Sequence, residues 1–485
     1  MKIRTITTIL AVFSSFLFHS RGSTSEKQNI VIMLADDMGF GELSCLNPQR
    51  GKIPTPQLDR IAAAGMIFND AHSGSSVCTP TRYGLLTGRY AWRTRLQKGV
   101  LTGGESLIAK DRMTLADLLK PEGYQTAIIG KWHLGILFNG KKMSGKVPVG
   151  AEVTHGPIDH AGFDMFFGFH HARQMNLWIE DDKVTEEIEH VEMLPKLTKK
   201  AVEYIHERKA DGRQFLLYVP WNSPHSPVVP TDEWKGKSGI NAHADFVMQT
   251  DDSFGQIYKA LEETGLIENT LVICSSDNGT SPQTSGLKEL KAAGHHPSGE
   301  LRGMKADLWD GGHRVPFIAA WKNVIEPGSR TDALACLTDL MATVADVVGA
   351  EYPESAAVDS VSLLPVFNDA SKSVRNSVVH HSISGKFAIR DADWKLLLTP
   401  GSGGWGSPKD NEAMKQGFPP VQLYRLGKDL GEETNLAEKN PEKVREMRSL
   451  LEKQVAAGRS TPGAPQKNDV EVDIDKQSKP RKREK

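Results

Sequence analysis

Residues 30–37 read IVIMLADD, a run of apolar residues that ends in two aspartates. The same form occurs three more times, with apolar runs before GKWH at 130–133, before PWNSPHSP at 220–227 and before SSDNG at 275–279. Continuous apolar runs that do not alternate with polar residues are typical of parallel strands covered on both faces. Helical patterns separate these runs. The sequence therefore predicts an α/β fold with a large, mostly parallel sheet flanked by helices.

The predicted helices have apolar residues at helical spacing or end at a glycine or proline. They span residues 57–64, 114–119, 244–263 and 331–348. After about residue 370 the chain changes to short strand-like runs separated by glycine-rich turns, followed by a predicted helix at 441–457. This part indicates a smaller antiparallel sheet with a helix packed on it.

The chain divides into four parts. Residues 1–23 combine a cationic start, a short apolar stretch and small residues, as a signal peptide does. Residues 28–370 are the predicted α/β domain, 371–465 the smaller α+β subdomain, and 466–485 a charged tail expected to be disordered. The protein is therefore expected to be exported, to the periplasm or the medium. An uncleaved N-terminal anchor is the alternative, and no other stretch is long and apolar enough for a membrane span.

The overall composition of the chain excludes several functions. Its 485 residues carry a formal net charge of −1, so no basic field indicates nucleic acid as a partner. The four cysteines form no C-x-x-C pair, which gives no support to a zinc ribbon or a thioredoxin-like site. The motif GSGGWG at 401–406 opens no helix and predicts a glycine-rich loop rather than a dinucleotide site.

The polar clusters that follow the apolar runs are expected at one edge of the sheet, because ligands bind beyond the carboxyl ends of its strands. Asp36 and Asp37 could form a solvated turn, and Asp277 and Asn278 an Asx-type turn. Together they offer four oxygen-bearing side chains, and such ligands favour Ca²⁺ or Mg²⁺ over zinc.

Cations and imidazoles are expected at the same edge. Lys131 and His133 lie two residues apart, so both could face one substrate. His225 lies in a proline-stiffened loop and suits general acid chemistry near neutral pH. Lys305 lies in a glycine-rich segment and is either a ligand-binding group or one more surface lysine.

The segment SSVCTPTRYGLLTGR at 75–89 places Cys78 just ahead of a helix predicted at 81–86. A helix N-terminus stabilises negative charge and lowers a thiol pKa, and Arg82 lies one turn along. An activated centre in an anion-binding site is one interpretation. A small buried cysteine is the other.

CTPTR at 78–82 followed by LLTGR at 85–89 resembles the C-x-P-S/A/T-R and T-G-R signature of the type I sulfatases, in the alkaline phosphatase superfamily. Thr81 stands where Ser or Ala is commoner. NIVIMLADDMGFGEL, GYQTAIIGKWHLG, SPHSP, SSDNG and GGHRVPFIAAW also resemble the family in the expected order. The resemblance spans about residues 28 to 460 and implies an alkaline-phosphatase-like fold and an arylsulfatase-like sulfuric ester hydrolase.

The resemblance implies roles for individual residues. Cys78 would be converted to Cα-formylglycine by a sulfatase-maturating enzyme, and its hydrate would be the nucleophile. The implied metal ligands, usually of Ca²⁺, are Asp36, Asp37, Cys78, Asp277 and Asn278. Arg82 would orient the formylglycine, Lys131 and Lys305 would hold sulfate oxygens, His225 would protonate the leaving oxygen, and His133 would act as a base.

An exported enzyme of this family is expected to act on sulfated saccharides. Residues predicted to contact the sugar are His170, His171, Arg173, Trp178, His295, His296, His313 and Arg314. A phosphonate monoester or phosphodiester hydrolase of the same superfamily is a second reading. A third is an inactive sugar-binding protein in which Cys78 stays unmodified.

Overall fold

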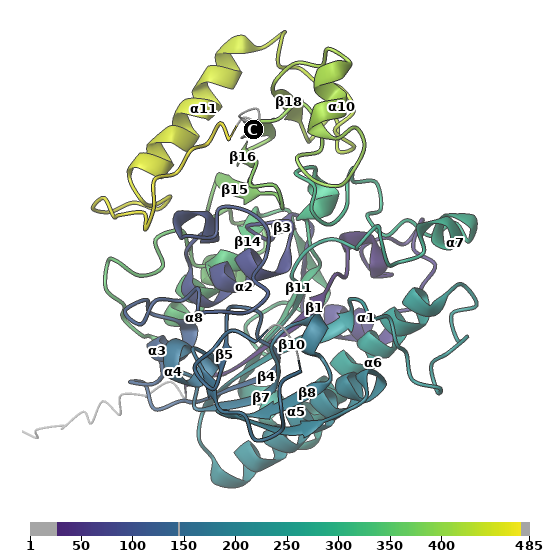
Figure 1. Cartoon of the computed structure of the whole chain (residues 1–485), viewed down its shortest axis with the longest axis vertical. Helices are drawn as coiled ribbons and strands as arrows, with labels where there is room; N and C mark the ends of the chain where they lie inside the picture. The colour runs from purple at the N-terminus through teal and green to yellow at the C-terminus, as the bar shows by residue number, and fades with distance from the viewer. Residues whose placement is uncertain (1–26, 144–145, 477–485) are drawn as a thin grey trace, which may run out of the picture.

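The computed structural model describes residues 27–143 and 146–476. Within these residues a ten-stranded sheet forms the body, and a four-stranded sheet lies above it in Figure 1. The order across the large sheet is β13 (Ser329–Thr331), β2 (Met66–Phe68), β12 (Phe317–Ala320), β11 (Thr270–Ser276), β1 (Asn29–Asp36), β10 (Phe215–Pro224), β4 (Gln125–Lys131), β7 (Met165–Phe169), β8 (Leu177–Glu180) and β9 (Lys183–Glu187).

The central strands β11, β1, β10, β4 and β7 run parallel, and antiparallel pairs occur toward both edges. The predicted α/β class with a mostly parallel sheet is confirmed. All eight residues of β1 are buried because the sheet is covered on both faces. Ile30, Ile32 and Leu34 point into one core and Val31 and Met33 into the other, so the strand needs apolar residues at every position.

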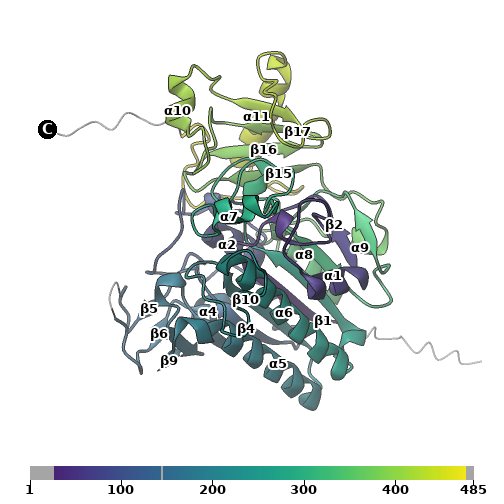
Figure 2. The same cartoon turned by 90° about the vertical axis from the view of Figure 1, so that its right-hand side faces the viewer.

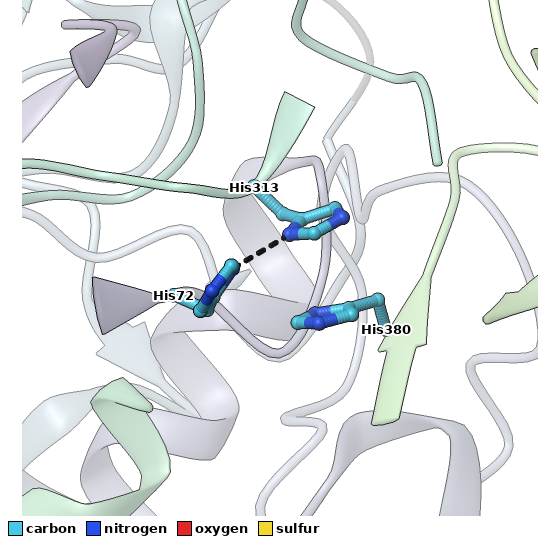
Figure 3. A group of neighbouring side chains, drawn as sticks. All are labelled: His72, His313 and His380. Atoms are coloured by element: carbon cyan, nitrogen blue, oxygen red, sulfur yellow. Dashed lines mark hydrogen bonds between the residues drawn. The ribbon is translucent and has the colours of Figure 1, made fainter. Parts of the chain in front are cut away.

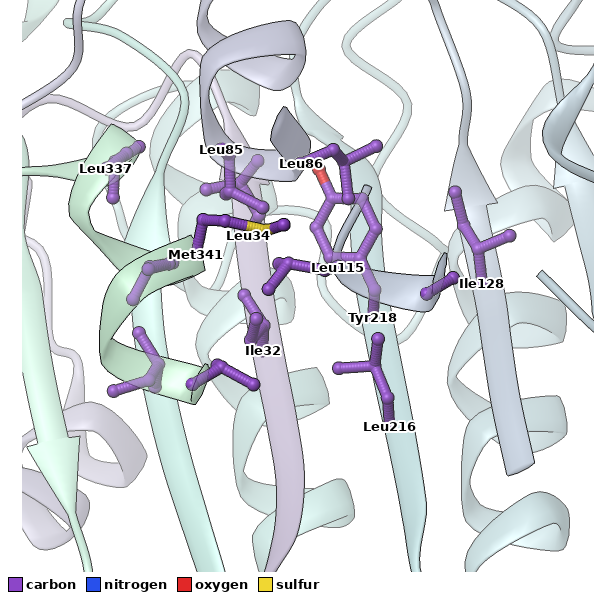
Figure 4. Packing of buried hydrophobic residues seen from close by; sticks show 14 of the residues in the cluster. Ile32, Leu34, Leu85, Leu86, Leu115, Ile128, Leu216, Tyr218, Leu337 and Met341 are labelled. Atoms are coloured by element: carbon purple, nitrogen blue, oxygen red, sulfur yellow. The ribbon is translucent and has the colours of Figure 1, made fainter. Parts of the chain in front are cut away.

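Helices cover the two faces of the sheet. The core in Figure 4 lies under α2 (Cys78–Thr87), α3 (Leu115–Leu119) and α8 (Leu340–Val348). The opposite core lies under α1 (Pro56–Ala63), α5 (Met193–Asp211) and α6 (Ala242–Glu263). Short elements complete the body: α4 (Pro157–Ala161), α7 (Leu287–Ala292), α9 (Leu364–Asn368) and the strand pairs β3 (Ala71–His72) with β14 (Ala335–Cys336) and β5 (Leu137–Phe138) with β6 (Val153–Thr154).

The small sheet is antiparallel and consists of β15 (Ser377–His381), β16 (Phe387–Asp391), β17 (Trp394–Leu397) and β18 (Gln422–Arg425). Figure 2 shows it stacked on the body together with α10 (Asp410–Lys415) and α11 (Pro441–Ala456). The antiparallel sheet with a packed helix was expected from the sequence. The loop 401–406 lies between β17 and α10 and is neither helix nor strand.

Four predicted helices occur within two residues of their expected bounds. The prediction for residues 331–348 is wrong in its first half, because β13 and β14 pair there with β2 and β3 and helix α8 begins only at Leu340. The helix after the cysteine motif is longer than expected. It begins at Cys78 itself, which is therefore the first residue of α2 rather than the residue ahead of it.

The expectation of a disordered tail fails for residues 466–476. Asp469 pairs with the buried Arg89 at 2.9 Å, and Ile474 packs into the apolar core of the small sheet. A buried guanidinium needs a charged or polar partner, and this segment supplies one. The remainder of the predicted tail and the predicted signal peptide at 1–23 lie outside the described residues. Within the described part, no helix combines the length and the hydropathy that a membrane span requires.

Candidate active site

The carboxyl ends of the central strands bring the predicted site residues together. Asp36 ends β1, Lys131 ends β4, His225 directly follows β10, and Asp277 directly follows β11. Helix α2 starts at this edge with Cys78. Ligand atoms of Asp36, Asp37, Cys78 and His225 all lie within 4.8 Å of one another.

Each carboxylate of the cluster meets a cation. Lys131 Nζ contacts Asp36, Lys305 Nζ lies 2.5 Å from Asp37 Oδ1, and Arg82 Nη2 lies 2.8 Å from Asp277 Oδ2. Burial disfavours the charge of Asp36, but Lys131 with neighbouring cations holds the pKa of its carboxyl well below the usual range. Burial, together with the charge of Asp36, raises the pKa of Asp277 to about 6.

Cys78 is 2 % exposed and lies between a carboxylate and an ammonium group. Its Sγ is 3.6 Å from Asp36 Oδ1 and 3.7 Å from Lys305 Nζ. Burial and the negative Asp277 raise the pKa of the thiol above its usual range. The lowered thiol pKa expected from the helix N-terminus is therefore wrong, because desolvation and the carboxylates outweigh the helix end.

The two imidazoles each have one nitrogen fixed by a backbone carbonyl. His225 Nδ1 lies 2.6 Å from Ser226 O, so Nδ1–H donates there and Nε2 faces Asp37 at 3.8 Å. His133 Nε2 lies 2.8 Å from Leu101 O and donates to it, which leaves Nδ1 buried and without a hydrogen-bond partner among the described residues. Burial, reinforced for His133 by Lys131, lowers the pKa of both rings.

The donor set at this edge fits a hard divalent cation. Asn278 Nδ2 donates to Asp37 Oδ1 at 2.7 Å, which turns Asn278 Oδ1 away, buried and unpartnered among the described residues. A buried amide oxygen without a donor is costly and is a ready metal ligand. Asp36, Asp37 and Asp277 provide carboxylate oxygens beside it. These four side chains suit Ca²⁺ or Mg²⁺.

Strained backbone occurs at three positions of the site. Asp37 has a φ of 67°, His133 of 58° and Ala306, directly after Lys305, of 81°. L-residues rarely adopt these conformations, and they persist only where surrounding contacts hold them, as at active sites. Ser276 and Thr280 supply two such contacts. Their hydroxyls accept hydrogen bonds from the backbone N–H groups of Met38 and Gly39. Neither residue was among the predicted site residues, although Ser276 and Thr280 flank Asp277, Asn278 and Gly279 in the sequence.

Three of the predicted sugar-contact residues lie near the site. The rings of His170 and His171 have centroids 6.2 and 5.8 Å from that of His133. Both ring nitrogens of His170 are buried without a partner among the described residues. Burial and the charge of Lys131 lower the pKa of His171 to about 4, and the exposed Arg173 contributes to the same shift.

The other five predicted sugar-contact residues are engaged elsewhere. Trp178 is buried in the core, where its Nε1 donates to Glu180 at 2.9 Å. His295 pairs with the buried Glu42 at 2.9 Å, and His296 lies 2.8 Å from an Arg50 nitrogen. These side chains are thus held by contacts within the chain, which a loop sequence does not report, and their contact with a sugar stays a prediction.

His313 and Arg314 belong to a second buried cluster between the two sheets. His313 Nδ1 lies 3.0 Å from His72 Nδ1, and its ring stacks on that of His380 at 3.7 Å (Figure 3). Arg314 pairs with Asp310 at 2.7 Å. Parallel stacked rings do not direct their in-plane lone pairs at one metal ion. We therefore describe this inter-sheet cluster as a hydrogen-bonded junction rather than a ligand site.

Comparisons with known proteins place this geometry in context. A family model described as Sulfatase matches residues 28–350. N-acetylgalactosamine-6-O-sulfatase of Bacteroides thetaiotaomicron is 30% identical over 499 residues, covering 89% of this chain and 94% of that protein. Human arylsulfatase A is 31% identical, covering 84% and 83%. A solved sulfatase structure, from work on glycosaminoglycan metabolism by Bacteroides thetaiotaomicron, superposes with a TM-score of 0.78 at 29% identity over 88% of this chain and 99% of that one.

Proposed function

The chain belongs to the sulfatase family and hydrolyses sulfate esters, and we propose that its substrates are sulfated carbohydrates. The observation that carries the proposal is full-length similarity to N-acetylgalactosamine-6-O-sulfatase combined with the cation-rich cluster at the strand ends. His170, His171 and Arg173 beside that cluster are the proposed contacts to the sugar. Imidazole and guanidinium groups can donate hydrogen bonds to hydroxyl and acidic groups of a saccharide.

Members of the sulfatase family typically use a metal ion and a formylglycine. We propose that Cys78 is the formylglycine precursor here, oxidised by a maturating enzyme. The hydrate of formylglycine supplies a hydroxyl nucleophile for the sulfur atom. The position of Cys78 supports this assignment, because it is the first residue of α2 and its Sγ lies 3.6 Å from Asp36 Oδ1 and 3.7 Å from Lys305 Nζ.

Lys131 and Lys305 are the proposed sulfate-binding groups. Their ammonium groups lie at the two aspartates and converge on Cys78 from different elements. A sulfate ester gains negative charge on its bridging oxygen as the bond to sulfur breaks, so preorganised cations stabilise the transition state. Arg82 of α2 donates hydrogen bonds to the Asp277 carboxylate and to the backbone carbonyl of Lys131. These bonds fix Asp277 and Lys131 relative to α2.

The two histidines divide the proton transfers. We assign His225 as the general acid, because its Nδ1 is anchored on Ser226 and its Nε2 faces the site. His133 is assigned as the base, because its Nδ1 carries a free lone pair beside Lys131. The proposed metal ligands are Asp36, Asp37, Asp277 and Asn278 with the modified Cys78. A bound Ca²⁺ or Mg²⁺ would add positive charge for the sulfate oxygens.

Two measurements test the proposal. Peptide mass spectrometry after expression with a maturating enzyme should show Cys78 about 18 Da lighter, as conversion of cysteine to formylglycine requires. A screen of sulfated mono- and oligosaccharides should then show sulfate release. Predominant phosphodiester turnover would favour a phosphonate monoester or phosphodiester hydrolase, and an unmodified Cys78 without turnover would favour a sugar-binding protein.

Export, proposed from residues 1–23, is tested by locating the protein after cell fractionation.

A further inference from the structure

The glycine loop, residues 401–406 (GSGGWG), reaches from the small sheet to the body. It lies against the Lys305 segment, residues 304–308, which carries one of the two proposed sulfate-binding lysines. Leu308 N donates to Ser402 O at 2.8 Å, and this bond joins the two segments directly. The small sheet therefore touches the chain at a point only three residues from Lys305.

Asp307 makes the main connection between the two segments. Its Oδ1 accepts hydrogen bonds from Trp405 N at 2.9 Å and Gly406 N at 2.7 Å. Its Oδ2 accepts from Met304 N at 3.1 Å. The residue is 2 % exposed, and no Lys or Arg forms an ion pair with it among the described residues. In the absence of a cation, the hydrogen bonds that this buried carboxylate accepts from backbone N–H groups compensate for its burial.

Gly404 and Gly406 of the loop are required by this close approach. A Cβ on Gly404 would lie 2.2 Å from the carbonyl oxygen of Ala306, and a Cβ on Gly406 would lie 2.6 Å from Asp307 Oδ2. Gly404 and Gly406 do not have positive φ, so backbone conformation is not what selects glycine at either position. Contact with the Lys305 segment explains these two glycines, whereas Gly403 has a φ of 67° and a Cβ on Gly401 would lie 2.6 Å from Pro408 O.

The Lys305 segment is also held by hydrogen bonds on its other side, which faces the strand-end cluster. Lys305 N donates to Thr280 O at 3.1 Å, and Ala306 N donates to Ser76 O at 2.8 Å. Thr280 closely follows Asn278, and Ser76 lies two residues before Cys78. Ala306 keeps its φ of 81° between these bonds and Asp307. The direction of the Lys305 side chain thus depends on backbone that is held by the strand-end cluster on one side and by the glycine loop on the other.

We propose that Asp307 is a positioning residue that fastens the glycine loop to the Lys305 segment and so sets the place of the Lys305 ammonium group in the sulfate pocket. The inference rests on the proposed sulfate-binding role of Lys305. It gives the small sheet a part in the chemistry of the body, through Lys305 and not through any contact with substrate. Displacing a positioned group by about 1 Å can cost a hundredfold in rate.

Two variants test the proposal. Asp307→Asn keeps one acceptor oxygen and loses the other, and Gly404→Ala forces the loop away from Ala306. Each should weaken inhibition by inorganic sulfate and lower kcat/KM for a sulfate ester by between about ten- and a hundredfold. The matched control is Gly431→Ala, whose added Cβ has no neighbour closer than 3.5 Å. It should leave both quantities unchanged.

Wild-type sulfate inhibition and kcat/KM in both variants, measured on protein with a cooperative unfolding transition, would overturn the proposal. The decisive measurement is a double-mutant cycle with Lys305→Ala. Because Asp307 acts through Lys305, Asp307→Asn should change the sulfate inhibition constant less than twofold in the Lys305→Ala protein. An undiminished effect there would show that Asp307 acts independently and would overturn the inference. Failure of the wild type to release sulfate from any ester would instead contradict the proposed function.

Discussion

Two buried polar clusters of similar burial do different work in this chain. The strand-end cluster around Asp36 and Lys131 and the inter-sheet cluster around Asp310 and Lys395 are both almost completely excluded from solvent. In the inter-sheet cluster the partners come from the two stacked sheets, with Lys395 of β17 reaching Asp310 at 2.6 Å. In the strand-end cluster the partners converge on one point at the carboxyl ends of parallel strands.

The two clusters show which features separate the proposed reaction site from a structural junction. Buried charge alone does not, since both clusters have it. Unpartnered polar atoms and strained backbone do not either, since His380 Nε2 has no partner among the described residues and Glu432 has a φ of 51°. The strand-end cluster differs in geometry: the carboxylates of Asp36, Asp37 and Asp277 and the unpartnered Asn278 Oδ1 converge at the carboxyl ends of parallel strands. Such features cost stability and are kept for function. The comparison predicts that substitutions in the first cluster change activity and substitutions in the second change stability.

The largest effect is expected from Cys78→Ala. Removing the proposed precursor of the nucleophile should lower kcat by at least about 10⁴-fold, because loss of a nucleophile removes most of the catalysis that it shares with its partners. The thermal unfolding transition should remain cooperative. Cys45→Ala, which changes a half-buried cysteine outside both clusters, should keep wild-type activity. A kcat of Cys78→Ala within tenfold of the wild-type value would show that the strand-end cluster is not the catalytic site.

The inter-sheet cluster should respond in the opposite way to Lys395→Met. Lys395 is fully buried and pairs with Asp310 and with Glu432 at 2.8 Å, so its loss leaves the buried Glu432 without a cation and Asp310 with Arg314 alone. The free energy of unfolding should fall by about 3–5 kcal/mol in denaturant titrations, while kcat per folded molecule stays within threefold. Lys322→Met, at an exposed pair with Glu268, should change the free energy by less than about 1 kcal/mol. Loss of activity without loss of stability would reverse the comparison.

Metal binding should affect the strand-end cluster alone. After chelation, Ca²⁺ or Mg²⁺ added at about 100 times its Kd should raise the free energy of unfolding by about 2.7 kcal/mol. Asp37→Asn should abolish this gain, because it removes a carboxylate from the donor set, whereas Lys395→Met should leave the gain intact. A gain that persists in Asp37→Asn would place the metal elsewhere, and its absence in the wild type would remove the metal from the proposal.

Much of the strand-end cluster could be predicted because its residues directly follow apolar strand runs. Asp36, Lys131, His225 and Asp277 reach one edge for that reason alone, since parallel strands align their carboxyl ends. The cysteine motif then identified the family. The fold class followed from the same runs, while the edge strand at Ser329–Thr331 did not, because its strand character depends on pairing with β2.

The remaining parts depend on side-chain direction and long-range contact. His313 and His295 have the composition of binding residues, but each turns into an internal network that no local pattern reports. Asp307 accepts from backbone groups about a hundred residues later, and backbone N–H groups have no sequence signature. The raised thiol pKa of Cys78 was missed for a related reason. The helix end is visible in the sequence, whereas the surrounding carboxylates are brought there by the fold.

The smallest effect concerns the inter-sheet histidines in acid. Burial, with the charge of Lys395 and the neighbouring His72, holds the pKa of His380 well below its ordinary value of 6.5. In acid the unfolded chain therefore binds a proton at this histidine that the folded protein does not bind. The free energy of unfolding is at its full value above about pH 6.5 and falls below that pH, by up to about 1.4 kcal/mol per pH unit per histidine. His380 Nε2 has no partner among the described residues, and Nδ1 lies 3.3 Å from Ser73 O, so His380→Phe removes one hydrogen bond and should lower the free energy of unfolding at pH 7.5 by about 1 kcal/mol. Between pH 6 and 5 the free energy of unfolding of His380→Phe should fall less steeply than that of the wild type, by a difference in slope that corresponds to about one proton.

The control is His206→Phe, at an exposed position of α5, which should follow the wild-type slope. Equal slopes in His380→Phe and the wild type would mean that His380 takes up a proton in the folded protein, and the inter-sheet cluster would then be a titrating site rather than a neutral junction.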